Sequence, residues 1–230
     1  MNNKFLQNKT ILLIFLILIS IVFGAVMILR GRNQSQKTEN QTSNPPAQNS
    51  VPEVVKPTND SQKLVPPIDN WSERTTKKPF GIYITPKNSP ISPERFIGYH
   101  IGVDFEVFSN EQNTDVQIFA VCKGPLVVKK YASGYGGVAV QQCKLDNQDI
   151  TVVYGHLKLS SVDASLGQQL STGEKIGILG KGFSVETDNE RKHLHLSIHK
   201  GKLVDILGYV QTSEELNDWI DITRVLTGIN

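Results

Sequence analysis

Cysteine is scarce in this chain of 230 residues, and neither sign of charge dominates it. The two cysteines are too few for a disulfide-rich scaffold or a cysteine-ligated zinc ribbon. Lys and Arg total 24 against 22 Asp and Glu, and the formal net charge of +2 excludes a whole-chain case for nucleic-acid binding. The length predicts one ordinary domain with additional segments, or two small domains.

One long apolar run lies near the N-terminus. Residues 10–29 carry no charge, and a helix of that length covers the roughly 30 Å hydrocarbon core of a bilayer. The best cleavage site, after Ala25, places the bulky Phe23 where a signal peptidase needs a small residue. Residues 1–30 are therefore predicted to be an uncleaved transmembrane signal anchor. Basic residues flank both ends of the run, so the charge pattern leaves its orientation open.

The segment after the apolar run contains no glycine between Gly31 and Gly81. Residues 31–70 hold six Pro and eleven Asn or Gln, with only seven apolar residues. Such a segment cannot bury enough apolar surface to offset the entropy of ordering it, and its proline pairs favour extended conformations. Residues 31–78 are predicted to be a disordered tether.

Glycine is concentrated in the remainder of the chain, residues 79–230, where fifteen of the eighteen Gly lie between Gly81 and Gly208. They separate short segments rich in Val and Ile that are predicted to be strands, namely 116–121, 125–131, 138–143, 150–154, 175–179 and 193–199. The spacing of the strands and turns predicts an all-β fold, an antiparallel sandwich or barrel-like sheet. A short C-terminal helix is predicted over 213–225, with Ser213 as its N-cap.

All five histidines fall in this β domain. His193 and His195 are two apart in a predicted strand, so their side chains project to the same face. His100 and Asp104 would lie about 13 Å apart on a straight strand, but Gly102 allows a bend that brings them to one point. Two His, one Asp and an open fourth position are typical of a catalytic zinc site. An HxH or an HxxxD pattern alone often occurs by chance in proteins. The prediction of a zinc site rests on the order of these patterns within one β domain.

Six segments together resemble the lysostaphin and LytM-type zinc endopeptidases, which cut peptidoglycan cross-links. They are 98–105 (GYHIGVDF), 121–127 (VCKGPLV), 134–138 (GYGGV), 154–157 (YGHL), 173–180 (GEKIGILG) and 193–196 (HLHL). The resemblance covers roughly residues 80–207. It implies an antiparallel sheet with a groove over the metal, the fold called the duplicated hybrid motif.

The resemblance also implies a role for each histidine of the three motifs. It makes His100, Asp104 and His195 the ligands of one zinc ion, and it places His193 and His156 beside the water that attacks the substrate. Zinc lowers the pKa of a bound water toward about 7, and a neutral imidazole is a suitable base for its proton.

Two departures from the family pattern are visible. The segment before His193, residues 183–192, is longer and more charged than the usual Ser/Thr/Gly-rich stretch. It is predicted to line the groove and so to affect the substrate preference rather than metal binding. After His195 the chain has Leu196 and Ser197 where the family usually has an aromatic residue and Glu. A hydrogen-bond contact that supports the metal ligands is therefore expected to be lost.

Other residues near the motifs have competing interpretations. His199 is read as an exposed residue at the strand end, with groove contact as the alternative. Glu106 is either a solvated strand charge or an acceptor for a ligand histidine. Tyr99 and Tyr154 are read as core residues, although a tyrosine hydroxyl could stabilise an oxyanion. The glycine cluster 134–137 is read as a hairpin turn, because no helix follows it as in a phosphate-binding loop.

The two cysteines, Cys122 and Cys143, lie near the outer ends of the two strands that this hairpin turn joins. Pairing around residue 134 would bring Cys143 close to Cys122, so a disulfide is geometrically plausible in an extracytoplasmic location. Two reduced, buried cysteines are the competing interpretation.

The sequence therefore predicts a membrane-anchored zinc endopeptidase that hydrolyses peptide bonds in cell-wall peptidoglycan, with its domain on the extracytoplasmic side. One alternative is a catalytically inactive domain of the same fold that binds cell wall or activates another hydrolase. Inactive relatives typically lose ligands, and none is lost here. A third hypothesis is a carbohydrate-binding module with fortuitous histidine pairs.

Overall fold

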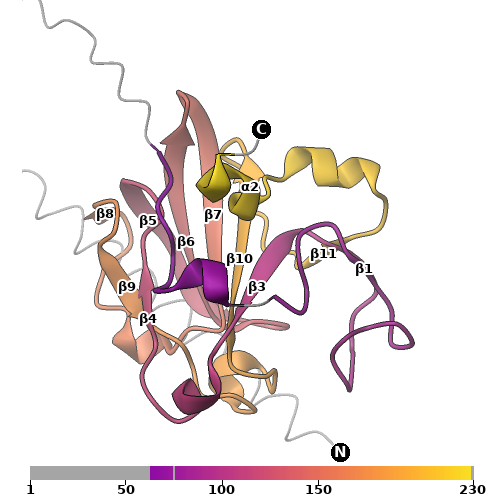
Figure 1. Cartoon of the computed structure of the whole chain (residues 1–230). Helices are drawn as coiled ribbons and strands as arrows, with labels where there is room; N and C mark the ends of the chain where they lie inside the picture. Colours follow the sequence, from indigo (N-terminus) through magenta and orange to yellow (C-terminus); the bar gives the residue numbers. More distant parts are fainter. Residues whose placement is uncertain (1–62, 75, 229–230) are drawn as a thin grey trace, which may run out of the picture. The chain divides into compact units, whose positions relative to one another are not determined.

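The computed structural model describes residues 63–74 and 76–228 (Figure 1). The predicted anchor, and the part of the predicted tether before residue 63, lie outside these residues. Among the residues described, no helix is long and apolar enough to cross a membrane.

The structure confirms an antiparallel, mostly-β fold with every predicted strand present. Its strands are β1 (Tyr83–Ile84), β2 (Gly98–His100), β3 (Gly102–Glu106), β4 (Gln117–Phe119), β5 (Gly124–Ala132), β6 (Gly136–Leu145), β7 (Gln148–Gly155), β8 (Gln169–Leu170), β9 (Lys175–Ile178), β10 (His193–Lys200) and β11 (Tyr209–Val210). They form a six-stranded sheet in the order β3-β10-β7-β6-β5-β8, a three-stranded sheet β1-β2-β11 and the pair β4-β9. The glycine cluster 134–137 makes the turn of the β5–β6 hairpin, as predicted.

The central strands β6, β7 and β10 are buried along most of their length. On one face of the sheet, alternate residues of β7 and β10, such as Tyr154 and Leu196, enter the main core. On the opposite face, Val138, Val140 and Val153 form a smaller cluster with Tyr135. Because both faces are covered, β6 lacks a simple alternation of apolar and polar residues, whereas β10 alternates apolar residues with His and Ser.

The chain passes from the small sheet to the large sheet between His100 and Asp104. His100 ends β2 and pairs with Tyr209 of β11, whereas Asp104 lies in β3 and pairs with His195 of β10. The residue that joins them, Ile101, is fully buried. One HxxxD segment thus contributes a side chain from each of two sheets to the same place.

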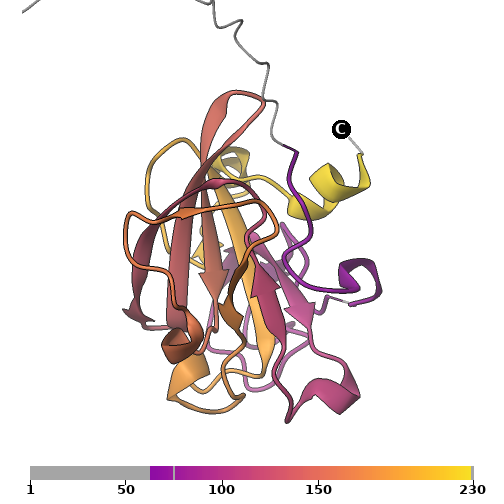
Figure 2. The same cartoon turned by 90° about the vertical axis from the view of Figure 1, so that its left-hand side faces the viewer.

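Residues 63–74 pack against the domain, although the composition assigns them to the tether. Leu64 and Ile68 are buried in the main core. The amide of Val65 donates to the carbonyl of Val121 at 2.9 Å. Figures 1 and 2 show this segment running along one side of the sheets. The packed part of the chain therefore begins before residue 79, because the few apolar residues of the proline-rich segment lie at its end.

The single helix predicted over 213–225 is wrong in detail, because the chain breaks it in two. A 3₁₀ helix spans Glu214–Asp218 and the short helix α2 spans Ile222–Thr227. Between them Trp219 is extended and buried, and the amide of Ile220 donates to the carbonyl of Ile198 at 2.9 Å. Asp221 caps α2, whereas the predicted cap, Ser213, makes no capping bond. Burial of the tryptophan and pairing with β10 outweigh continuation of the helix.

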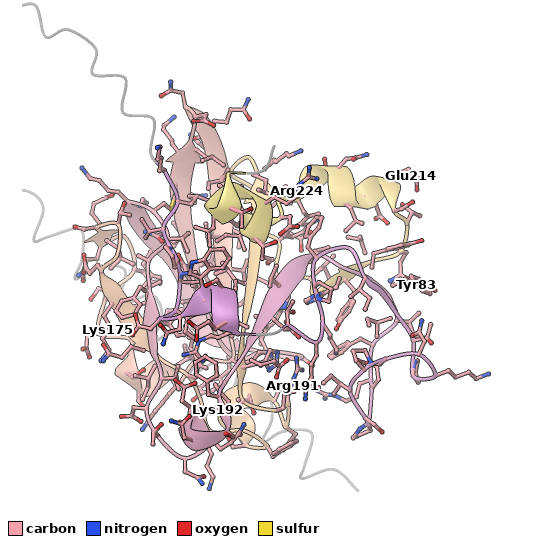
Figure 3. The ribbon with its side chains drawn as sticks, viewed as in Figure 1. Tyr83, Lys175, Arg191, Lys192, Glu214 and Arg224 are labelled. Atoms are coloured by element: carbon pink, nitrogen blue, oxygen red, sulfur yellow. A yellow bond between two sulfur atoms is a disulfide. The ribbon has the colours of Figure 1, made fainter. Side chains whose placement is uncertain are left out.

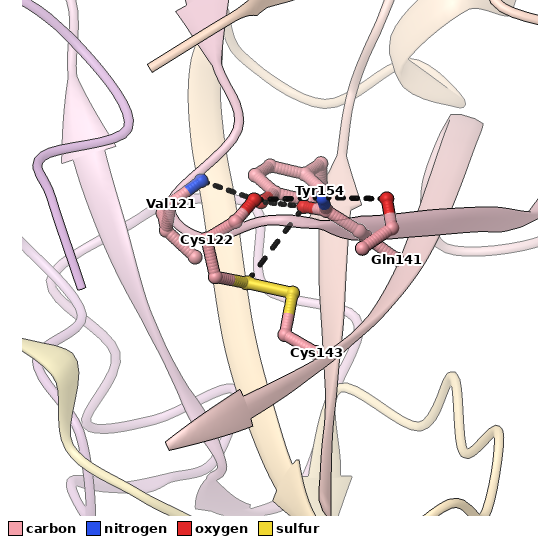
Figure 4. Close-up of a disulfide and its surroundings, with 6 residues drawn as sticks. Val121, Cys122, Gln141, Cys143 and Tyr154 are labelled. Carbon is pink, nitrogen blue, oxygen red and sulfur yellow. Dashed lines mark hydrogen bonds between the residues drawn. A yellow bond between two sulfur atoms is a disulfide. The ribbon is translucent and has the colours of Figure 1, made fainter. Parts of the chain in front are cut away.

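Cys122 and Cys143 form a disulfide, with Cα atoms 6.1 Å apart (Figure 4). Beside it, the hydroxyl of Tyr154 accepts from the amide of Val121 and donates to Oε1 of Gln141, both at 3.0 Å. The Gln141 amide in turn donates to the carbonyl of Cys122 at 2.8 Å. The Tyr154 hydroxyl thus belongs to a buried structural network, which confirms its assignment to the core.

Candidate metal centre

Three of the predicted residues meet at one point. Nε2 of His100 lies 3.3 Å from Oδ1 of Asp104, and Nδ1 of His195 lies 3.0 Å from the same oxygen. The two nitrogens are 3.0 Å apart. Two zinc–ligand bonds of about 2.0 Å at a tetrahedral angle place their ligand atoms about 3.3 Å apart. The triangle therefore has nearly the size that a tetrahedral zinc ion requires.

In His100 and His195, the ring nitrogen that does not face Asp104 makes a hydrogen bond to another group. These hydrogen bonds leave the other nitrogen of each ring with a lone pair that points toward the position of the metal. Nδ1 of His100 lies 3.3 Å from the carbonyl of Pro79, which can only accept, so the proton is assigned to Nδ1. Nε2 of His195 lies 3.2 Å from the Tyr135 hydroxyl, which donates its own proton to the carbonyl of Leu207 at 2.9 Å. The tyrosine oxygen therefore accepts from His195, whose Nδ1 is left without a proton.

The ionisation of the three groups also suits a cation. Burial acts to raise the pKa of Asp104, but the neighbouring His193 and His100 hold that pKa well below its usual range. Burial lowers the pKa of His195 to about 4. At neutral pH the site therefore presents a carboxylate and an unprotonated imidazole, the forms that bind metal. The lone pairs of the two histidine nitrogens and the Asp104 oxygen converge on one position, and no proton lies between them. This arrangement fits a bound zinc ion.

Gly102 makes room for this arrangement, but not through the bend that the sequence suggests. Its φ angle lies outside the left-handed region that favours glycine. A Cβ atom on Gly102 would lie 2.5 Å from the carbonyl oxygen of Leu196 and 2.8 Å from Cε1 of His195. Glycine is needed here because β3 passes directly beside the ligand ring.

His193 and His156 lie together next to the three ligands, with ring centroids 4.2 Å apart. Nδ1 of His193 donates to the carbonyl of Arg191 at 2.9 Å, which leaves Nε2 to face Asp104 Oδ2 at 3.3 Å. Nδ1 of His156 is buried and has no hydrogen-bond partner. Burial, followed by the charge of His193, lowers the pKa of His156 well below its usual value. The five predicted site residues thus lie in one cluster.

These residues line a cavity of about 300 Å³. Its apolar and aromatic walls are Phe96, Ile97, Tyr135, Ile206, Leu207 and Tyr209. Two of its charged residues are neutralised within the protein: Lys78 lies 2.5 Å from Glu94, and Glu190 lies 2.8 Å from Arg95. Arg191, from the loop predicted to line the groove, forms its ion pair with Asp104 itself.

The structure places the other residues named from the sequence away from the metal ligands. The ring of His199 packs on Trp219, with centroids 4.8 Å apart, so it is half-buried rather than exposed. Tyr99 packs on Tyr83 at 4.8 Å. Glu106 is neither a solvated charge nor an acceptor for a ligand histidine, because its carboxylate binds Arg191.

Sequence reasoning missed three residues of the site, namely Tyr135, Arg191 and Tyr209. Tyr135 lies inside a motif that carried the family resemblance, so that motif was an available signal. Arg191 and Tyr209 lie outside the segments that carried it, and only folding brings them to the cavity.

Comparisons with known proteins agree with this geometry. Residues 98–206 match the model of Peptidase family M23. Endolysin 2638A of Staphylococcus phage 2638A is 33% identical over 102 residues, which make up 44% of this chain and 19% of the endolysin. The chain thus covers less than a fifth of that relative's length.

Two solved structures are also similar to the chain. The catalytic domain of the antimicrobial peptidase lysostaphin from Staphylococcus simulans shares 19% identity, with a TM-score of 0.47, over 68% of this chain and 95% of that one. A zinc containing peptidase from Vibrio cholerae shares 20% identity, with a TM-score of 0.39, over 58% of this chain and 35% of that one.

The family match spans all three metal-centre residues and the two neighbouring histidines. Residues 98–206 therefore belong to peptidase family M23, and they contain an intact site formed by His100, Asp104 and His195.

Proposed function

We propose that this protein is a membrane-anchored, zinc-dependent endopeptidase that hydrolyses peptide bonds in cell-wall peptidoglycan, with its β domain on the extracytoplasmic side. The observation that carries the proposal is the complete set of three metal-binding side chains with two further histidines beside them. The match to a peptidase family and the name of the sequence relative, an endolysin, support the same class of reaction and substrate.

Bound at this site by His100, Asp104 and His195, zinc would polarise a peptide carbonyl and lower the pKa of water. Of the neighbouring pair, His193 keeps its Nε2 free because its Nδ1 proton is donated to the carbonyl of Arg191. The lowered pKa keeps His156 neutral at physiological pH, so its ring can accept a proton. This pair takes the proton of the attacking water and returns it to the leaving amine.

The charged side chains of the cavity are already paired within the protein, and this affects which substrate side chains the cavity can accept. The cavity presents apolar and aromatic walls, and its lysine, its glutamate and its arginine already have partners. An uncharged stretch of peptide around the cleaved bond fits such walls, because a charged side chain there would lose hydration without gaining a free partner.

The first prediction separates metal binding from proton transfer. In the full chain purified in detergent, His195→Ala should lose both bound zinc and digestion of purified peptidoglycan. His193→Ala should keep zinc and lose activity by about 10²–10⁴-fold, the usual contribution of a general base. His199→Ala is the matched control, because it lies on the same strand but outside the cavity. Bound zinc and peptide release are measured on the same samples.

Stoichiometric zinc in the wild type without digestion of any wall type would instead support an inactive domain that binds cell wall. The membrane part of the proposal has its own test. Protease added to intact cells should remove the β domain from the anchored chain, and complete protection would contradict the extracytoplasmic placement.

A further inference from the structure

The side chain of Arg191 contacts Asp104 at the carboxylate oxygen that does not face the two histidine ligands. Its Nη2 donates to Oδ2 of Asp104 at 2.9 Å, while Oδ1 of the same carboxylate faces His100 and His195. Oδ1 of Asp104 thus faces the position of the metal, whereas Oδ2 faces the guanidinium and, at 3.3 Å, Nε2 of His193.

The guanidinium is itself held by a second carboxylate. Nε of Arg191 lies 3.0 and 3.1 Å from the two oxygens of Glu106, and Nη2 lies 2.5 Å from one of them. Asp104 and Glu106 are two residues apart on β3, so their side chains project to the same face. The planar guanidinium bridges both of them, a geometry that a lysine ammonium cannot reproduce.

The backbone of Arg191 makes a second contact with the site. Its carbonyl accepts from Nδ1 of His193 at 2.9 Å and thereby orients the ring whose Nε2 faces the centre. Arg191, labelled in Figure 3, is separated from His193, the first residue of β10, by Lys192 alone. One residue therefore orients a metal ligand with its side chain and a neighbouring histidine with its backbone.

We propose that Arg191 is a positioning residue of the metal centre. It occupies Oδ2 of Asp104, so that Oδ1 is the carboxylate oxygen left to hold a metal. Residues 183–192 therefore influence metal binding as well as the shape of the groove, contrary to the expectation from the sequence. The inference rests on the metal site of the proposed function and is tested separately from activity.

Arg95 provides a matched control within the same region. Its Nη2 lies 2.8 Å from Glu190 and 3.3 Å from Asp188, so it ties the same loop as Arg191, through ion pairs that are more exposed to solvent. It contacts no metal ligand. A loss caused only by loosening the loop should appear in both arginine variants, whereas a loss of ligand orientation should appear only at Arg191.

The test measures metal binding by the full chain in detergent after the native metal is removed with a chelator. Zinc affinity is measured by competition with a chromophoric chelator, and ligand geometry is measured from the visible absorption bands of bound Co²⁺. We expect Arg191→Gln and Arg191→Lys to bind zinc about 10–100-fold more weakly and to change the cobalt bands. Arg95→Gln should keep wild-type affinity and bands.

Wild-type zinc affinity and cobalt bands in Arg191→Lys would overturn the positioning role. If Arg191→Gln fails to fold, as judged by circular dichroism, the lysine variant decides, because it keeps the charge and loses only the bridge. An equal loss in the Arg95 variant would also overturn the role. A wild type that binds zinc with these responses but digests no peptidoglycan would refute the proposed function alone.

Discussion

At the scale of single residues, the metal centre depends on Gly102, which has no side chain, as much as on its three ligands. Gly102 lies so close to the ring of His195 that a Cβ atom would overlap it. This closeness fixes the distance between β3, which carries Asp104, and β10, which carries His195. The position tolerates no larger residue, although its backbone conformation is one that any residue adopts.

Gly102→Ala is therefore expected to destabilise the domain by about 1–3 kcal/mol through overpacking and to weaken zinc binding by about 10–100-fold. Denaturant unfolding and chelator competition measure the two effects. Gly173→Ala is the control, because Gly173 has a positive φ but open space around it. It should cost about 1–2 kcal/mol and leave zinc affinity unchanged. A Gly102→Ala variant with normal zinc affinity would contradict this account.

The candidate residues of the site could be found from the sequence because they occur in short motifs, and the resemblance to a known family, rather than the spacing, selected His195 over His193 as the ligand. His193 and His195 are two positions apart in one strand and therefore project to the same face, and His100 and Asp104 lie in one short segment. Arg191 and Tyr135 could not be assigned in this way. Their contacts with Asp104 and His195 exist only because a loop and a hairpin turn meet over the sheet.

At the scale of the elements, the disulfide ties the start of β5 to the far end of β6. Cys122 and Cys143 are 21 positions apart. Closing a loop of about 20 residues contributes roughly 3 kcal/mol to the free energy of unfolding on the chain-entropy model. The buried network of Tyr154 and Gln141 lies beside the bond and does not depend on it for its hydrogen bonds (Figure 4).

Reductant should therefore lower the free energy of unfolding by about 3 kcal/mol, measured by urea unfolding. The double variant Cys122→Ala/Cys143→Ala should start from a lower stability and show no response to reductant. Equal stability of the oxidised and reduced wild type would show that the bond contributes nothing to the fold.

The C-terminal segment shows why its single predicted helix was wrong. Glu214 and Glu215 are suitable residues for a first helical turn, and local preference alone favours continuation. Trp219 instead pairs with His199 as an isolated β-bridge and buries its ring. Such a contact between distant parts of the chain is invisible to local sequence patterns.

At the scale of the whole molecule, the fold class followed from the regular succession of strands and turns, while the start of the packed domain did not. Proline and polar residues dominate the segment up to residue 70 and conceal the few apolar residues that enter the core, Leu64 and Ile68. The end of this segment is held by Arg74, which forms a two-pronged ion pair with Glu111 at 2.6 and 2.9 Å.

This ion pair predicts an acid-sensitive contribution to stability. The hydrogen bonds from Arg74 hold the pKa of Glu111 below its usual value. A lowered folded-state pKa contributes stability that is complete above the unfolded pKa, about 4.3 for Glu, and is lost as pH falls through the folded value. Urea unfolding between pH 7 and pH 3 should show a smaller loss of stability in Glu111→Gln than in the wild type. Parallel pH profiles for the two proteins would refute this assignment.

The passage of the chain from one sheet to the other at Ile101 has a consequence for folding as well as for chemistry. His100 belongs to the three-stranded sheet, whereas Asp104 and His195 belong to the six-stranded sheet. An ion bound by all three would act as a cross-link between the sheets and favour the folded state by mass action. A free metal concentration 100 times the Kd would add about 2.7 kcal/mol to the free energy of unfolding. The concentration of free zinc around the protein would then set the stability of the domain.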